Sequence, residues 1–135
     1  MLALLAALAL LPAIGTAPAA AQPGREPWSA ERVAELQAAG RPVFVNLTAA
    51  WCISCKVNEA LVLDTAAVRA AFAARNVALL TGDWTRGDAA ITALLRAQGR
   101  DGVPLYLLYP PGEGAPALLP QILSEGALRE ALGKL

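Results

Sequence analysis

The chain's two cysteines, Cys52 and Cys55, stand three positions apart in a C-x-x-C arrangement. An apolar run at residues 43–47 leads into them, and a pattern typical of a helix follows. A strand that opens directly into a helix places both thiols in the first helical turn. Unpaired backbone N–H groups and the positive end of the helix dipole stabilise a thiolate there. The arrangement therefore predicts a dithiol/disulfide redox site.

The composition narrows the possible functions. With 135 residues, the chain fits one domain of ordinary size. Lys+Arg and Asp+Glu balance at 11 each, so there is no basic surplus that would favour nucleic-acid binding. The sequence has no histidine, and two cysteines do not fill a structural zinc site, which takes about four Cys or His ligands. We therefore expect no metal and no cofactor other than the dithiol itself.

The first 21 residues are dominated by Ala and Leu. Residues 2–11 have the length of the apolar region of a signal peptide and are too short to span a bilayer alone, although no Lys or Arg precedes them. A second interpretation is the end of a transmembrane helix that begins outside the chain, with Met1 as an internal or alternative start. Both interpretations place the remainder beyond the cytoplasmic membrane, as a periplasmic domain that is exported or membrane-tethered.

Residues 22–27 are expected to form a flexible linker, and residues 28–135 the folded domain. The turn signal at residues 110–114 indicates a hairpin, and Pro116 and Pro120 place the last strand at an edge. The order of elements predicts an α/β domain with a central, mixed four-stranded sheet and helices on both faces, which fits a thioredoxin-like fold. The expected helices are residues 30–39, 52–63, 65–74, 89–98 and a last one from the cap Ser124 to Leu132; the expected strands are residues 43–48, 77–84, 105–109 and 117–122.

Four segments carry a closer resemblance: residues 46–52, 55–59, 82–85 and 103–106. With them the chain resembles the C-terminal, periplasmic thioredoxin-like domain of the DsbD family of thiol:disulfide interchange proteins, over residues 28–135. In that family the domain follows the last helix of a membrane-embedded electron carrier. The resemblance implies a protein-disulfide reductase that takes electrons from a membrane dithiol carrier and passes them to periplasmic disulfide-containing proteins.

The motif suggests different roles for its residues. Cys52 is expected to be the exposed, attacking thiol and Cys55 the buried, resolving one. The alternative is a fixed disulfide staple, but a loop so small adds little stability. The resemblance implies that Trp51 packs beside the site and shapes the partner contact. It also implies a cis Pro104 opposite the dithiol, with the backbone of Val103 turned towards an incoming peptide.

Charged and amide side chains near the motif are the candidates for tuning the thiols. Thioredoxins usually carry a buried aspartate six residues before the first cysteine, whereas this chain has Asn46, which cannot take a proton. Glu59 matches a glutamate of the DsbD domain and is the candidate tuning carboxylate, with a solvated helix glutamate as the alternative. Lys56 either adds positive potential or is simply solvated. Asp83 and Trp84 end a predicted strand and are candidates for lining the rim of the site.

Two other functions stay open at this level. A stand-alone periplasmic thioredoxin-like protein would act on other disulfides, including those of apocytochromes in cytochrome c biogenesis. A non-catalytic thioredoxin-like binding module would keep its disulfide permanently. In each case we expect a monomer, and for a redox carrier we expect brief contacts over a small surface.

Overall fold

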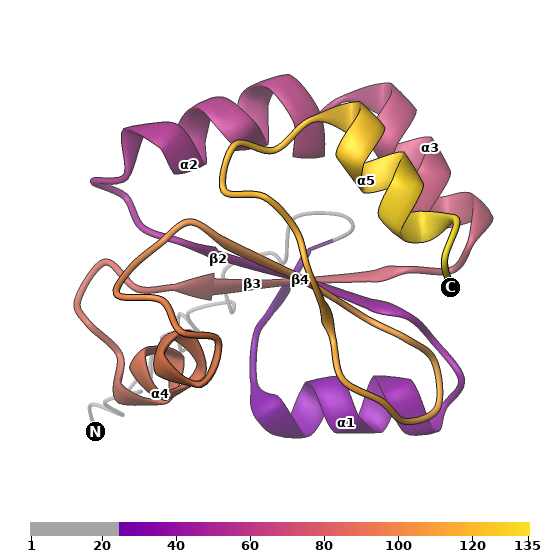
Figure 1. The fold of residues 1–135 in the computed structure, drawn as a ribbon, viewed down its shortest axis with the longest axis horizontal. Coiled ribbons are helices and arrows are strands. Elements are labelled where there is room, and N and C mark those ends of the chain that lie inside the picture. Colours follow the sequence, from indigo (N-terminus) through magenta and orange to yellow (C-terminus); the bar gives the residue numbers. More distant parts are fainter. Residues whose placement is uncertain (1–24) are drawn as a thin grey trace, which may run out of the picture.

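The computed structural model describes residues 25–135. Its sheet has five strands in the order β1-β3-β2-β4-β5, with β1, β3 and β2 parallel to one another and β4 and β5 completing it in antiparallel pairs (Figure 1). The strands are β1 (Glu26–Pro27), β2 (Val43–Thr48), β3 (Ala78–Asp83), β4 (Leu105–Tyr109) and β5 (Ala117–Leu118). The helices are α1 (Ala30–Ala38), α2 (Ile53–Asn58), the π-helical turn η1 (Glu59–Leu63), α3 (Ala66–Ala74), α4 (Ala89–Ala97) and α5 (Glu125–Leu132).

Strand β2 is the central strand of the sheet and leads directly to the two cysteines. All six of its residues are buried, because β3 and β4 flank it and helices cover both of its faces. A strand buried on both faces needs apolar side chains on both, which explains the unbroken apolar run at 43–45. Asn46, a fully buried amide, and Thr48, a buried hydroxyl residue, are the polar residues of this strand.

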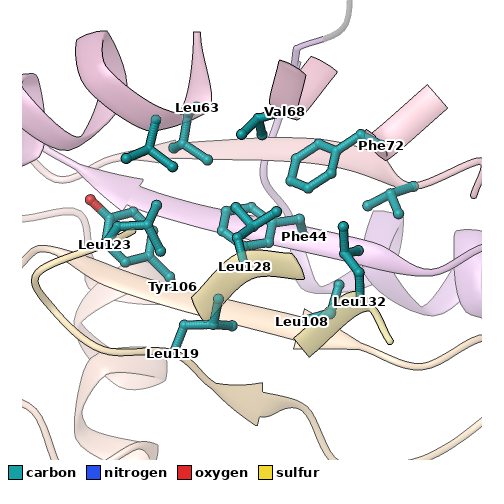
Figure 2. Close-up of a cluster of buried hydrophobic side chains, with 12 residues drawn as sticks. Phe44, Leu63, Val68, Phe72, Tyr106, Leu108, Leu119, Leu123, Leu128 and Leu132 are labelled. Atoms are coloured by element: carbon teal, nitrogen blue, oxygen red, sulfur yellow. The ribbon is translucent and has the colours of Figure 1, made fainter. Parts of the chain in front are cut away.

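Two apolar cores lie on opposite faces of the sheet. Helices α1 and α4 cover one face, while α2, η1, α3 and α5 cover the other (Figure 1). Alternate residues of β2 divide between them: Phe44 joins the second core and Val45 the first. Figure 2 shows the second core, in which the Phe44 ring lies 5.3 Å from that of Phe72 and 6.1 Å from that of Tyr106. The π-helical turn η1, which continues α2, packs into this aromatic and aliphatic layer through Val62 and Leu63.

The helix boundaries follow from capping residues in the sequence. A side-chain oxygen accepts a hydrogen bond from the backbone N–H three positions later at the start of four helices. Gly40 ends the turn after α1 with φ of +78°, a conformation that favours glycine. The four capping residues are Ser29, Thr65, Asp88 and Ser124.

The prediction of four strands is wrong by one. Glu26 and Pro27, at the end of the expected linker, pair with Leu80 and Thr81 of β3 and form the edge strand β1. A two-residue strand that contains a proline has no periodicity to reveal it. The predicted signal-like or transmembrane segment at residues 1–21 lies outside the described residues, as does the start of the linker. Among residues 25–135, no helix has the length and apolar character needed to cross a membrane.

Two further elements differ from their expected extents. The helix expected over 52–63 is α-helical only as far as Asn58. It continues as the π turn η1, in which the Asp64 N–H donates to the Glu59 carbonyl at 2.8 Å. The last strand, expected over 117–122, ends at Leu118. Pro120 has no N–H to give to a ladder, and the backbone groups of the next residues bond to a side chain of α2 instead.

Candidate active site

Cys52 and Cys55 form a disulfide at the start of α2, as their spacing predicts. Cys52 is the N-cap residue of the helix, and its sulfur accepts a hydrogen bond from the Cys55 N–H at 3.2 Å. A backbone donor is therefore already aimed at the sulfur that would carry negative charge after reduction. The Ser54 hydroxyl lies 3.6 Å from the same sulfur.

The burial of the two sulfurs differs in the expected direction but less than expected. Cys55 has no exposed surface, and Cys52 is 6% exposed. Cys52 is therefore the cysteine of the pair that reaches solvent, but only along one edge. Both pack with Ala49 and with the half-buried Val103. The Val103–Pro104 peptide bond is cis, as the resemblance implies, and it places Val103 against the dithiol.

The Glu59 cluster, which consists of Asn46, Lys56 and Glu59, lies beneath the disulfide. Glu59 is only 6% exposed, which excludes a solvated helix glutamate. One of its carboxylate oxygens accepts a hydrogen bond from the Asn46 amide at 3.1 Å, and the other pairs with the Lys56 ammonium at 3.1 Å. Lys56 is half-exposed, so the ion pair has one end in water. The Asn46 Oδ1 atom is buried and has no hydrogen-bond partner among the described residues.

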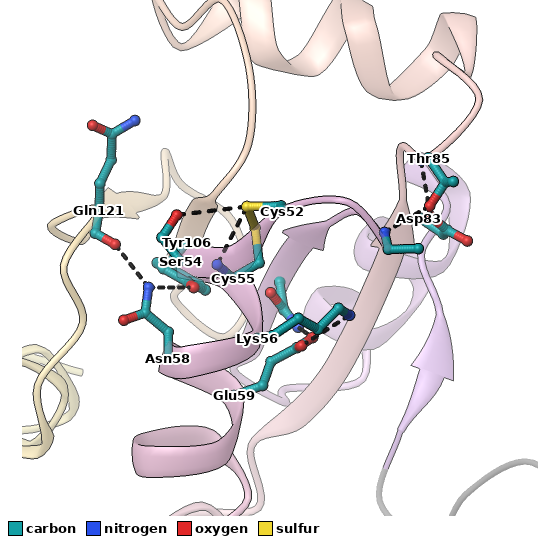
Figure 3. The surroundings of a disulfide bond; sticks show 12 residues. Cys52, Ser54, Cys55, Lys56, Asn58, Glu59, Asp83, Thr85, Tyr106 and Gln121 are labelled. Carbon is teal, nitrogen blue, oxygen red and sulfur yellow. Dashed lines mark hydrogen bonds and ion pairs between the residues drawn. A yellow bond between two sulfur atoms is a disulfide. The ribbon is translucent and has the colours of Figure 1, made fainter.

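The Asn58 cluster, which consists of Asn58, Tyr106, Gln121 and Leu123, was not predicted. The Asn58 amide nitrogen donates to the Tyr106 hydroxyl and to the Gln121 carbonyl, both at 2.8 Å, and its Oδ1 accepts from the Leu123 N–H at 3.3 Å. Burial raises the pKa of Tyr106 to about 12, so its hydroxyl stays protonated near neutrality. Figure 3 shows this cluster and the Lys56–Glu59 pair on different sides of α2. The sequence signal that could have found this cluster is Asn58 itself, a polar residue on the inward face of the helix one turn after Cys55.

Trp51 forms the exposed rim of the site. Its side chain is 58% exposed, and its indole N–H donates to the Thr85 carbonyl at 3.2 Å. The ring packs against that of Trp84, with centroids 6.0 Å apart. Asp83 and Trp84 therefore do lie at this rim, next to Trp51.

Thr85 is a rim residue that the sequence did not single out. Its hydroxyl accepts from the Ala50 N–H at 2.9 Å and donates to the Asp83 carboxylate, which also accepts from the Thr85 N–H at 2.9 Å. These two donors, helped by the positive charges of Lys56 and Arg86, lower the pKa of Asp83. The loop after β3 is thus fastened to the loop that carries Trp51.

The chemistry available to this arrangement is thiol–disulfide exchange. The described residues contain no group of three or more His, Cys, Asp or Glu side chains that would hold a metal ion. The two sulfurs, one at the surface edge and one fully buried, lie at the centre of the site.

Comparison with known proteins agrees with this geometry. A family model described as thioredoxin-like matches residues 25–111. The thiol:disulfide interchange protein DsbD of Ralstonia nicotianae is 40% identical over 79 residues, a stretch that covers 58% of this chain and 13% of that protein. The chain therefore corresponds to a small part of such relatives.

Two solved structures support the fold. The oxidised C-terminal domain of Neisseria meningitidis DsbD superposes with a TM-score of 0.58 at 24% identity, covering 77% of this chain and 86% of that domain. A thioredoxin from Thermus thermophilus gives a TM-score of 0.64 at 23% identity, covering 82% of this chain and 84% of that one.

Proposed function

The chain belongs to the thioredoxin-like family, and from this premise we propose that it is a protein-disulfide reductase of the DsbD type. The observation that carries the proposal is the Cys52–Cys55 disulfide at the start of α2, with the cis Val103–Pro104 bond on one side and the exposed Trp51 on the other. A structural staple would not need an exposed tryptophan beside it.

The proposed reaction moves two electrons from the reduced site to a partner. The Cys52 thiolate attacks one sulfur of the partner's disulfide; that disulfide breaks, a Cys52–partner disulfide forms, and the leaving sulfur takes up a proton. Cys55 then loses its proton and attacks the Cys52 sulfur. The Cys52–Cys55 disulfide closes, and the partner leaves with both of its sulfurs as thiols. A dithiol donor restores the reduced site by the same steps in reverse.

Glu59 is the proposed acceptor of the Cys55 proton. It lies four residues after Cys55 on the same helix, and it is the one carboxylate side chain among the described residues that is buried. Asn46 stands where thioredoxins usually have an aspartate, and here it orients Glu59 through a hydrogen bond instead of accepting a proton itself. Lys56 places a positive charge 3.1 Å from this buried carboxylate.

The name of the relatives, thiol:disulfide interchange proteins, supports the following proposed partners. The donor is a membrane-embedded dithiol carrier, and the acceptors are periplasmic proteins with disulfides, including those of cytochrome c biogenesis. The domain works as a monomer on the periplasmic side of the membrane, tethered or exported through residues 1–21. No metal or organic cofactor takes part, because the two cysteines are the redox centre.

The reduction potential tests the direction of electron flow. Equilibration of the Cys52–Cys55 pair with dithiothreitol and glutathione buffers is expected to give a value below about −200 mV, on the reducing side of the thioredoxin family. A value near about −120 mV, typical of strong thiol oxidants, would contradict a reductase and favour an oxidising role on other disulfides.

A further inference from the structure

We propose that Thr85 is a positioning residue that holds Trp51 beside Cys52, so that a partner protein meets a preformed aromatic surface next to the reactive sulfur. The proposal rests on the reductase function above and concerns the binding of the polypeptide around a partner's disulfide. Thr85 follows β3, and Trp51 follows β2, so the contact joins the ends of two neighbouring strands.

The Thr85 hydroxyl is fixed from both sides. It accepts the Ala50 N–H and donates to the Asp83 carboxylate, so it has one orientation that satisfies both neighbours. The carbonyl of Thr85 in turn accepts the Trp51 indole N–H. One residue thus ties down the backbone before Trp51 and the polar end of its side chain.

A second contact fixes the ring of Trp51. The Trp84 ring packs against it at 6.0 Å, and the Trp84 indole N–H donates to the Thr92 hydroxyl of α4 at 2.9 Å. Both indole N–H groups therefore have a hydrogen-bond partner within the protein, although Trp51 remains more than half exposed. An exposed aromatic with fixed orientation loses little conformational freedom when a partner covers it, and tryptophan is enriched at the centres of protein interfaces.

The contacts of Thr85 predict an effect on the binding of a partner polypeptide and none on the reactivity of the Cys52 sulfur. Its hydrogen bonds go to Ala50, Trp51 and Asp83 and to neither sulfur. The groups that face the Cys52 sulfur, the Cys55 N–H and the Ser54 hydroxyl, both belong to α2. Loss of the Thr85 hydroxyl should therefore weaken capture of a polypeptide disulfide and leave the reactivity of Cys52 towards a small disulfide intact.

The test compares two probes: insulin, a protein disulfide, and 5,5′-dithiobis(2-nitrobenzoate), a small aromatic disulfide. Thr85→Val is expected to lower kcat/KM for insulin about fivefold, mostly through KM, and to leave the rate with the small probe within about twofold of the unsubstituted chain. Thr85→Ser keeps the hydroxyl and should restore the insulin rate. Thr81→Val is the matched control, because the Thr81 hydroxyl on β3 has no hydrogen-bond partner among the described residues.

Each outcome decides the matter. Equal insulin kinetics for Thr85→Val and the unsubstituted chain would overturn the proposal, and so would equal losses with both probes. Failure of Thr85→Ser to restore the insulin rate would also count against it. If Thr85→Val does not fold, Thr85→Ala provides the same comparison. If the unsubstituted reduced chain reacts with neither probe, the reductase function itself is wrong, which is a different result.

Discussion

The two polar clusters beside α2, the Asn58 cluster and the Glu59 cluster, differ in how many of their polar atoms have a hydrogen-bond partner. In the Asn58 cluster, one neutral amide makes three hydrogen bonds and fastens the segment after β5 to α2. In the Glu59 cluster, a buried carboxylate is paired with a half-exposed lysine, and the neighbouring Asn46 keeps an acceptor without a partner. A neutral, saturated network adds rigidity. A charged, incompletely saturated one can change its protonation, so we assign structure to the first and proton transfer to the second.

The largest expected effect is on the Glu59 side. Glu59→Gln keeps the shape and the contact with Asn46 but removes the proton acceptor, so closure of the Cys52–Cys55 disulfide from a mixed disulfide should slow by about a hundredfold. Stopped-flow release of glutathione from the mixed disulfide measures this step. Glu125→Gln, an exposed carboxylate on α5, is the control. An unchanged rate in Glu59→Gln would remove Glu59 from the mechanism.

Asn58→Leu should change the stability of the fold and not the rate of the redox reaction. It leaves the Gln121 carbonyl, the Leu123 N–H and the Tyr106 hydroxyl without their partner. The last two belong to buried residues, and each buried group left unpaired costs about 1–3 kcal/mol. We expect a loss of about 2–4 kcal/mol in the free energy of unfolding, measured with urea, and little change in the reaction of Cys52 with a small disulfide. A normal stability combined with a slow redox reaction would reverse the assignment of the two clusters.

The Tyr106 hydroxyl of the Asn58 cluster should make the free energy of unfolding depend on pH. Because burial raises its pKa in the folded chain from 10.0 to about 12, the unfolded chain loses this proton first as the pH rises. The stabilising contribution is complete below about pH 10 and is lost as the pH rises towards 12. Burial also raises the pKa of Tyr109, which adds to the same trend.

Unfolding measured between about pH 9 and about pH 12 therefore should show a decline that Tyr106→Phe makes shallower. Tyr109→Phe isolates the other contribution. A decline of the same steepness in Tyr106→Phe would show that burial does not hold this hydroxyl in its protonated form.

Lys56→Met is expected to have the smallest effect. Its ion pair with Glu59 has one half-exposed end, and pairs of that kind contribute about 1 kcal/mol or less to stability. Urea unfolding should therefore change by less than about 1 kcal/mol, and the change should shrink further in high salt. A salt-independent loss larger than that of Asn58→Leu would mean that the Glu59 cluster, too, is mainly structural.

The sequence predicted what depends on local spacing. The position of Cys52 and Cys55 at the start of a helix follows from an apolar strand that runs into a helical pattern. Three helix starts follow from the predicted caps Ser29, Asp88 and Ser124, whereas α3 is capped by Thr65 and not by Asp64, which the sequence had suggested. Glu59 was identified from the resemblance to the DsbD domain, and its spacing of four residues from Cys55 places both on one face of the helix.

The features that the sequence did not predict depend on contacts between distant residues. Asn58 bonds to groups that lie 48 to 65 positions later in the chain, so its polar character on the inward face of the helix could not show which partners it has. Thr85 acts on the Trp51 loop from 34 or 35 positions away. The small exposure of Cys52 is likewise a property of tertiary packing, because Ala49 and Val103 cover it.

The reactivity of Cys52 in the reduced chain tests the central claim most directly. Reduced protein is treated with iodoacetamide at a series of pH values, and mass spectrometry follows the alkylation of each cysteine. The account predicts that Cys52 reacts at pH 6–7 faster than free glutathione, while Cys55 stays protected. Alkylation of Cys52 no faster than that of glutathione over the whole range, or equal protection of both cysteines, would contradict a reactive thiolate at the start of α2.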